Sequence, residues 1–191
     1  MNFKDILEQR HCCRKFSRKD VGQHKIVSII EAATLAPSAG NIFSVRIILV
    51  KDQEKKNKLA EAALNQLFIA EAPYILVVCS DPSQVVASYG KRGEMYTAQQ
   101  AGAAIENMFL KITDLELDTC WIGAFDENAV KRILAIPNHV KVEAMMPIGK
   151  GEEEISLKKR IERKKIDVKH ITFFNRYKLR KEKPDLNFRV D

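Results

Sequence analysis

The stretch from Met95 to Glu116 reads MYTAQQAGAAIENMFLKITDLE, and it carries the strongest periodicity in the chain. Its apolar residues recur at steps of three, one, three, four and three, which is the spacing of one helix face. They are Ala101, Ala104, Ile105, Met108, Ile112 and Leu115. We therefore predict a long central helix over 95–116, whose many small residues allow another backbone to approach closely.

Shorter elements surround this helix on both sides. The spacing of apolar residues and the capping positions of Asp52 and Asp126 predict further helices over 3–10, 24–36, 53–71 and 127–135. Apolar runs predict strands over 45–50, 74–79, 119–122 and 142–148, while residues 80–94 are polar and irregular. Strands and helices alternate too irregularly for a doubly wound parallel sheet, so we predict a mixed α+β fold.

Composition bounds the class of protein. The chain has 191 residues, 46% of them hydrophobic and 30% charged, and a chain of this length can bury roughly 70% of its unfolded surface. The uncharged run 35–45, which extends back to residue 32, is too short and too polar to span a bilayer. The N-terminal residues have no apolar signal-peptide region, so we expect a cytoplasmic protein without a membrane partner.

Several common sites find no support in the sequence. The four cysteines and four histidines lack the spacing of a zinc site, so we expect no metal. The chain has no G-x-G-x-x-G run after a strand, no P-loop and no G-x-S-x-G motif. These absences argue against a Rossmann dinucleotide site, a phosphate-binding loop and a hydrolase nucleophile.

The formal net charge of +7 is unevenly distributed. Residues 158–165 hold six cations and one acid, and 178–183 add four more cations. Such a run can attract nucleic acid, a membrane surface or a phosphate-bearing small molecule, although many are simply solvated faces. The few aromatic residues do not interleave with it, which argues against nucleic acid as a partner.

Arg10 is out of place on its helix. It follows Phe3, Ile6 and Leu7 at helical spacing, so it continues an apolar face. A cation there costs several kcal/mol unless an anion meets it. The pattern therefore predicts either a bound anion near Arg10, or an arginine that snorkels or pairs with a local acid such as Glu8.

Four short segments together resemble those of a known family. They are 10–14 (RHCCR), 36–41 (APSAGN), 119–125 (TCWIGAF) and 146–149 (MPIG). In this order they are similar to segments of the nitroreductase family of FMN-dependent oxidoreductases. The resemblance implies a nitroreductase-like α+β fold with a mixed, mainly antiparallel central sheet flanked by helices. It also implies an FMN-binding domain over 1–177, a charged tail over 178–191, and an intertwined homodimer with a flavin at each interface site.

The same resemblance implies residue roles in the first segment. Arg10 stands at the phosphate-binding position, followed by His11 in the same cofactor-binding stretch. Cys12 stands where a serine is usual, which weakens or removes a hydroxyl bond to the flavin tail. Arg14 would lie beside the pyrimidine end of the ring, where a cation stabilises the reduced, anionic flavin.

Three later segments complete the implied site. Pro37, Ser38 and Asn41 match a loop that reaches the flavin from the partner subunit, with Asn41 bonding the ring edge. The backbone of Ile122 and Gly123 would face N5 of the flavin, where a glycine permits close approach. A basic pair, Arg163 and Lys165, would complete the phosphate site, while the 146–149 segment has a structural role.

The implied activity is hydride transfer from NADH or NADPH, through FMN, to a small-molecule electron acceptor such as a nitroaromatic or a quinone. The flavin carries the chemistry, so we assign no catalytic side chain. The family's usual Gln-Pro-Trp after Asn41 is replaced by Phe43-Ser44-Val45. This departure leaves open other flavin chemistry on the same fold, namely dehalogenation, dehydrogenation or flavin breakdown. A basic nucleic-acid-binding module is the alternative from another class.

Overall fold

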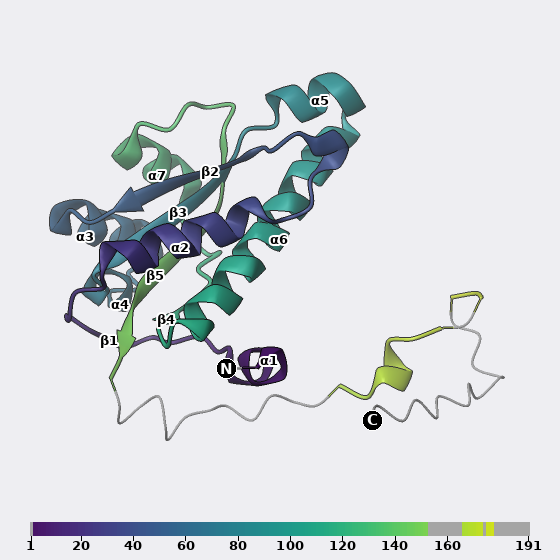
Figure 1. Cartoon of the computed structure of the whole chain (residues 1–191). Coiled ribbons are helices and arrows are strands. Elements are labelled where there is room, and N and C mark those ends of the chain that lie inside the picture. Colours follow the sequence, from purple (N-terminus) through teal and green to yellow (C-terminus); the bar gives the residue numbers. More distant parts are fainter. Residues whose placement is uncertain (1, 153–165, 174, 178–191) are drawn as a thin grey trace. The chain divides into compact units, whose positions relative to one another are not determined.

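The computed structural model describes residues 2–152, 166–173 and 175–177, and it divides the chain into two compact units, Met1–Lys159 and Arg160–Asp191. The described residues of the first unit contain the sheet, seven α-helices and one 3-10 helix, and Figure 1 shows residues 2–152 as one layered body. Among the described residues of the second unit, one short 3-10 helix forms, η2 (Val168–His170). The expected boundary after residue 177 stays a prediction.

The central sheet has five strands, and every pairing between them is antiparallel. The strand order is β1-β5-β3-β2, and β4 also pairs with β5. The strands are β1 (Phe16–Ser17), β2 (Val45–Val50), β3 (Tyr74–Ser80), β4 (Asp118–Thr119) and β5 (Lys141–Gly151). The long strand β5 therefore holds β1, β3 and β4 together. This arrangement confirms the predicted mixed α+β fold with an antiparallel sheet.

Helices cover both faces of the sheet (Figure 1). On one face, α2 (Gln23–Thr34) and α6 (Arg92–Asp114) pack over alternate residues of β3, namely Tyr74, Leu76 and Val78. On the other face, α3 (Gln53–Ala62), α4 (Phe68–Glu71) and α7 (Glu127–Leu134) cover Ile75, Val77 and Cys79 of that strand. Because both faces are covered, all seven residues of β3 are buried, which explains its apolar run over 74–79.

The central helix α6 has the buried face that the sequence predicts, but it begins three residues earlier than expected. Gly93 explains the start: a Cβ there would lie 2.7 Å from the backbone of Val86, so only glycine permits this approach. Val86 belongs to α5 (Ser83–Tyr89), a helix within the 80–94 region that we expected to be irregular. Its single buried residue, Val85, leaves too little periodicity to detect.

Three other expectations need correction. The helix expected over 53–71 is broken, because Leu64 and Asn65 adopt left-handed φ angles of 58° between α3 and α4. The strand expected over 119–122 is only β4, followed by an isolated bridge from Ile122 to Met145. Every residue of α1 (Phe3–Gln9) is exposed or half-buried within the described chain, so the predicted buried face is not covered there.

Helix capping follows the sequence closely. The Asp52 side chain accepts a hydrogen bond from Lys55 N at 2.8 Å, and Asp126 accepts one from Ala129 N at 3.0 Å. Both acids cap the helices that we expected them to cap. Among the described residues, no helix combines the length and the apolar character needed to cross a membrane.

Candidate functional site

The first and third of the four sequence segments meet at one edge of the sheet. The backbone N–H of Cys13 donates to the carbonyl of Thr119 at 2.8 Å, which joins the loop after α1 to the segment that contains β4. Thr119 itself is paired with Ile148 of β5. Residues 10–14 and 119–123, distant in sequence, therefore form one continuous surface supported by the sheet.

A contact between His11 and Asp118 also joins these two segments. His11 Nε2 lies 3.2 Å from Asp118 Oδ1, and His11 Nδ1 lies 3.0 Å from the Gln9 carbonyl. Both ring nitrogens face acceptors, so both contacts are hydrogen bonds only when the imidazole carries two protons. Asp118 Oδ2 also accepts from Gly151 N at 2.7 Å, which ties the site to the end of β5.

Arg10 has an aromatic support and one long ion pair. Its Nε lies 3.7 Å from Glu106 Oε1, and its guanidinium carbon lies 5.5 Å from the ring centroid of Phe109. The acid partner of Arg10 is thus Glu106 on α6, in place of the Glu8 pairing that the sequence left open. The Arg10 side chain is 24% exposed and Glu106 is 48% exposed, so this pair is partly open to water. A second anion can therefore reach the guanidinium from solvent.

The segment after β4 presents open backbone. The Trp121 ring stacks near Phe109 with centroids 6.4 Å apart, and Ile122 is held by its bridge to Met145. Gly123 is exposed, and the atom nearest to a Cβ built there would be Trp121 Nε1 at 3.8 Å. A flat ligand can approach the peptide groups around Gly123 without meeting a side chain from that residue.

Cys12 lies against Cys120 in this surface. The side-chain interaction with Cys120 lowers the pKa of Cys12 to about 5, although partial burial opposes the shift. The Cys120 thiol also lies 4.0 Å from the Trp121 carbonyl. A hydrogen bond to the Trp121 backbone and the positive charges of Arg10 and Arg14 act in the same lowering direction. The surroundings of Cys12 therefore favour its thiolate form, which carries a negative charge where a serine would be neutral.

The second segment lies elsewhere on the same chain. Pro37 and Ser38 lead into η1 (Ala39–Asn41), in which Asn41 is exposed and adopts a left-handed φ of 59°. A Cβ at Gly40 would lie 2.5 Å from the Tyr89 hydroxyl, and the Tyr89 ring contacts Tyr96 on α6.

Contacts along helix α6 show how far the loop with Asn41 lies from the loop with Arg10. Arg10 contacts Glu106, ten residues beyond Tyr96, which is roughly 15 Å along the helix axis. Figure 1 likewise shows the loop before β2 near one end of α6 and α1 near the other. The structure of the single chain therefore does not bring Asn41 to Arg10.

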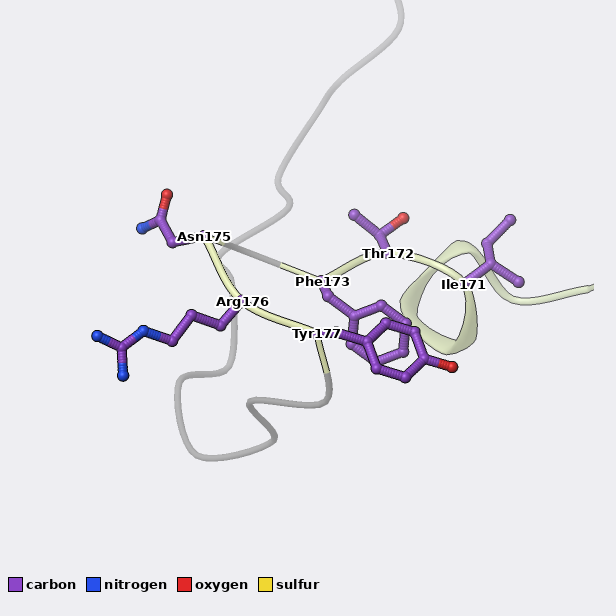
Figure 2. Close-up of a pocket in the computed structure, with 6 residues that line it drawn as sticks. All are labelled: Ile171, Thr172, Phe173, Asn175, Arg176 and Tyr177. Atoms are coloured by element: carbon purple, nitrogen blue, oxygen red, sulfur yellow. The ribbon is translucent and has the colours of Figure 1, made fainter. Parts of the chain in front are cut away.

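The remaining predicted site residues, Arg163 and Lys165, lie outside the described residues. The second unit shows a shallow hollow lined by Ile171, Thr172, Phe173, Asn175, Arg176 and Tyr177. Figure 2 shows the Phe173 and Tyr177 rings against each other, while the Arg176 side chain points away from them. The two ring centroids are 4.7 Å apart. Within the described ranges, no three His, Cys, Asp or Glu side chains are grouped to hold a metal.

Sequence reasoning missed three residues that shape this surface: Glu106, Phe109 and Asp118. Phe109 follows Met108 in the central helix, and nothing in its spacing distinguishes packing from support of an arginine. Asp118 carried a usable signal, because it is an acid directly before the buried Thr119 of a candidate segment. Glu106 could not have been assigned, since many exposed helix acids have no specific partner.

Comparisons with known proteins agree with this geometry. The sequence profile described as the nitroreductase family matches residues 7–72 and 64–150, which together make up well over half of the chain. A protein of Methanocaldococcus jannaschii named as a nitroreductase is 36% identical over 107 residues, covering 56% of this chain and 53% of that relative. The chain thus matches about half the length of that protein.

Other relatives match over more of their length. A protein of Archaeoglobus fulgidus named NADH dehydrogenase/NAD(P)H nitroreductase is 29% identical, covering 78% of this chain and 85% of the relative. The crystal structure of a nitroreductase family protein from Clostridium novyi is 27% identical with a TM-score of 0.74, covering 82% and 88% of the two chains. An NADPH:FMN oxidoreductase from Vibrio harveyi, complexed with NAD+, is 23% identical and covers 93% of this chain and 78% of its own. Its TM-score of 0.80 shows the same fold.

Proposed function

Because this chain belongs to the nitroreductase family of oxidoreductases, we propose that it binds FMN and uses NADH or NADPH to reduce a small electron-poor acceptor. Nitroaromatic compounds and quinones are the acceptor classes that we favour. The observation that carries the proposal is the joint surface of residues 10–14 and 119–123, in which a partly solvated arginine lies beside open backbone.

The first test of fit concerns the phosphate of FMN. The Arg10 guanidinium offers a planar fork that suits phosphate oxygens, and its existing partner Glu106 is held only at 3.7 Å. Contact with the Phe109 ring fixes the orientation of the guanidinium. Arg14 is exposed and adds a second cation to the same loop. These donors fit a dianionic group, and we propose Arg163 and Lys165 as further cations of this site.

The second test concerns the flavin ring. Ile122 is fixed by a two-way backbone bridge to Met145 at 3.0 Å, so the following peptide is held in place. Gly123 leaves that peptide uncovered, which suits close contact with a flat ring. When bound, FMN would supply the hydride chemistry. The chain's own residues would bind the phosphate, orient the ring, and place Arg14 where negative charge develops.

The third test concerns the partner subunit. Asn41, Pro37 and Ser38 belong to the proposed site, yet roughly 15 Å of helix separates their region from Arg10 in one chain. A homodimer resolves this, because the loop of one subunit can complete the site of the other. The single chain also exposes an apolar hollow between α1, α2 and α6, lined in part by Phe3, Ile6 and Leu35. Contact with a second copy would cover this hollow.

Cys12 bears on how tightly the phosphate would bind. A serine hydroxyl could donate to a phosphate oxygen, whereas a thiolate cannot donate and repels it. We therefore expect weaker FMN affinity than with serine at this position. The cytoplasmic location expected from the sequence also stays a prediction.

The proposal is tested by the visible spectrum of the purified protein and by titration with FMN. We expect a flavin absorbance that NADH or NADPH bleaches and that a nitroaromatic or quinone restores. Arg10→Ala should weaken FMN binding at least tenfold, because a charge-assisted hydrogen bond contributes about 1.5–3 kcal/mol. Arg132→Ala, which removes an exposed arginine from α7, serves as the matched control and should leave FMN affinity unchanged.

Two outcomes would contradict the proposal at different levels. Unchanged FMN affinity in Arg10→Ala, with an intact fold by circular dichroism, would refute the phosphate assignment alone. Colourless protein that refuses added FMN would refute the flavin proposal as a whole. Strong, steeply salt-dependent DNA binding by that protein would then favour the nucleic-acid-binding alternative.

A further inference from the structure

We propose that Cys12 and Cys120 form a redox-active pair, in which Cys12 attacks a hydroperoxide and Cys120 then closes a disulfide with it. The inference goes beyond the flavin chemistry, and the pair does not depend on FMN being bound. It rests on the interaction between the two cysteine side chains, their unequal exposure, and the charges around Cys12.

The backbone brings the two cysteines together. The hydrogen bond from Cys13 N to Thr119 O, at 2.8 Å, joins their immediate neighbours in sequence. One residue back along the first segment and one residue forward along the second lie Cys12 and Cys120, whose side chains interact with each other. The Cys120 thiol also lies 4.0 Å from the Trp121 carbonyl. A disulfide therefore needs only a local adjustment of two adjacent loops.

The two thiols differ in access and in charge. Cys12 is exposed, whereas Cys120 is 1% exposed, so an oxidant from solution meets Cys12 first. The side-chain interaction with Cys120 lowers the pKa of Cys12 to about 5, and Arg10 and Arg14 assist. The same contact and its burial raise the pKa of Cys120 well above the ordinary value, so it stays a thiol. The pair thus has one attacking sulfur and one protected, resolving sulfur.

The other two cysteines have different surroundings. Cys13 is buried and its thiol donates to the Lys15 carbonyl at 3.1 Å. Cys79 lies inside β3, where burial raises its pKa to about 11. Neither combines exposure with a lowered pKa, so they provide natural controls within the same chain.

The proposed reaction needs no reagent besides the hydroperoxide and the two thiols. The Cys12 thiolate attacks one peroxide oxygen, the O–O bond breaks, and the alcohol or water leaves with a proton from solvent. Cys12 is then a sulfenic acid. The Cys120 sulfur attacks the Cys12 sulfur, the S–O bond breaks, and the hydroxide leaves as water with the Cys120 proton. Two thiols are oxidised by two electrons, and one hydroperoxide is reduced.

The test treats the purified protein with a small excess of hydrogen peroxide at pH 7 and blocks the remaining thiols with N-ethylmaleimide in acid. Peptide mass spectrometry should find a Cys12–Cys120 cross-link and the loss of two of the four thiols, reversed by dithiothreitol. Cys12→Ser should slow this loss at least tenfold. Cys120→Ser should stop at a sulfenic acid on Cys12, which dimedone traps.

Cys13→Ser is the matched control, because it removes the neighbouring thiol and should leave the cross-link unchanged. A cross-link between Cys12 and Cys13, or no cross-link with or without added FMN, would overturn the proposal. Saturating FMN should slow the oxidation if its phosphate lies near Arg10. An equal rate with and without FMN would count against the flavin placement while leaving the cysteine pair intact.

A second measurement tests the state of Cys12 without an oxidant. Iodoacetamide should label wild-type Cys12 at rates that change less than about twofold from pH 6.5 to 8.5, because the pKa of Cys12 lies below this range. A thiol with an ordinary pKa of about 8.5 would become roughly fifty-fold more reactive over that range. Cys120→Ala should restore a steep dependence, since it removes the largest cause of the shift. A steep dependence already in the wild type would overturn the assignment of Cys12 as the attacking residue.

Discussion

Glu127 is an acid that its surroundings keep charged, although partial burial works against ionisation. Lys131 Nζ lies 2.9 Å from Glu127 Oε1, and Val142 N donates to the same oxygen at 3.2 Å. Together they hold the pKa of Glu127 below its ordinary value. The acid therefore joins the start of α7 to the start of β5 with a charge-dependent contact.

The resulting pH dependence has a definite sign. A lowered folded-state pKa adds stability that is complete above the ordinary glutamate pKa of about 4.3 and is lost as pH falls through the lowered value. Glu127→Gln should therefore have a lower melting temperature than the wild type at pH 7. Near pH 3 the two melting temperatures should be closer together. Glu54→Gln, in an exposed pair with Lys58, is the control and should show little change. Equal offsets for Glu127→Gln at both pH values would refute this role.

Single residues of the site were predictable to different degrees. Arg10 stood out because a cation on an apolar helical face needs an explanation, and the structure indeed gives it an acid and an aromatic ring. Cys12 and Cys120 gave no such signal. Isolated cysteines are commonly inert core residues, and only their contact across two loops distinguishes them. Their relation depends on a backbone hydrogen bond between segments more than one hundred residues apart.

At the scale of elements, α3 and α4 show where apolar spacing is insufficient. Leu64 has a left-handed φ of 58° and is 69% exposed, whereas Leu67 has an ordinary helical φ of −59° and is 65% exposed. Leu67 fits the apolar spacing with Leu59 and Ala63, so the sequence predicts one helix over 53–71 that runs through Leu64. The break depends on backbone angles that apolar spacing does not encode, and it allows Ile69 to be buried.

These two leucines provide a matched test of backbone strain. Leu64→Gly should raise the free energy of unfolding by about 1 kcal/mol, because glycine adopts a left-handed φ without the steric cost that leucine bears. Leu67→Gly should lower it by about 0.5 kcal/mol, because Leu67, at the N-cap of α4, already has right-handed helical angles and glycine only adds freedom to the unfolded chain. Urea unfolding of both variants measures the difference. Destabilisation of similar size in both would show that the left-handed angle carries no cost here.

Whether the other elements could be predicted from the sequence depended on how many of their residues are buried. Strand β3 was predictable because all its positions are buried, and the buried face of α6 was predictable because its buried residues recur at helical spacing. Short elements were not: β4 has two residues, and α5 has one buried residue, so neither gives a detectable period. Their positions are set by pairing with β5 and by packing against α6, which are tertiary effects.

At the scale of the whole molecule, the proposed dimer can be separated from general surface effects. Leu35 is 81% exposed and lines the hollow between α1, α2 and α6, while Leu67 is 65% exposed beside α4 on the opposite face of the sheet. Leu35→Asp should weaken dimerisation by ten- to a hundredfold, because burying a leucine contributes about 1.5–3 kcal/mol. Leu67→Asp should leave it unchanged. Sedimentation equilibrium measures both dissociation constants.

The flavin content of the same variants adds an independent readout. If Asn41 of one subunit completes the site of the other, Leu35→Asp should lose bound FMN as it dissociates, and FMN loss should follow protein dilution. A monomeric Leu35→Asp variant that keeps full FMN affinity would refute the shared site. The ordered segments predicted the family's fold, but no pattern within one chain states which surface another copy covers.

The position of β5 has a consequence for synthesis on the ribosome. Strand β3 pairs with β2 on one side and with β5 on the other, and β5 begins at residue 141, about sixty residues after β3 ends. While those residues are being translated, the nascent chain carries a largely apolar seven-residue strand with one unpaired edge. Such an edge readily joins another strand. Shielding of the emerging polypeptide during this interval therefore favours the yield of folded protein.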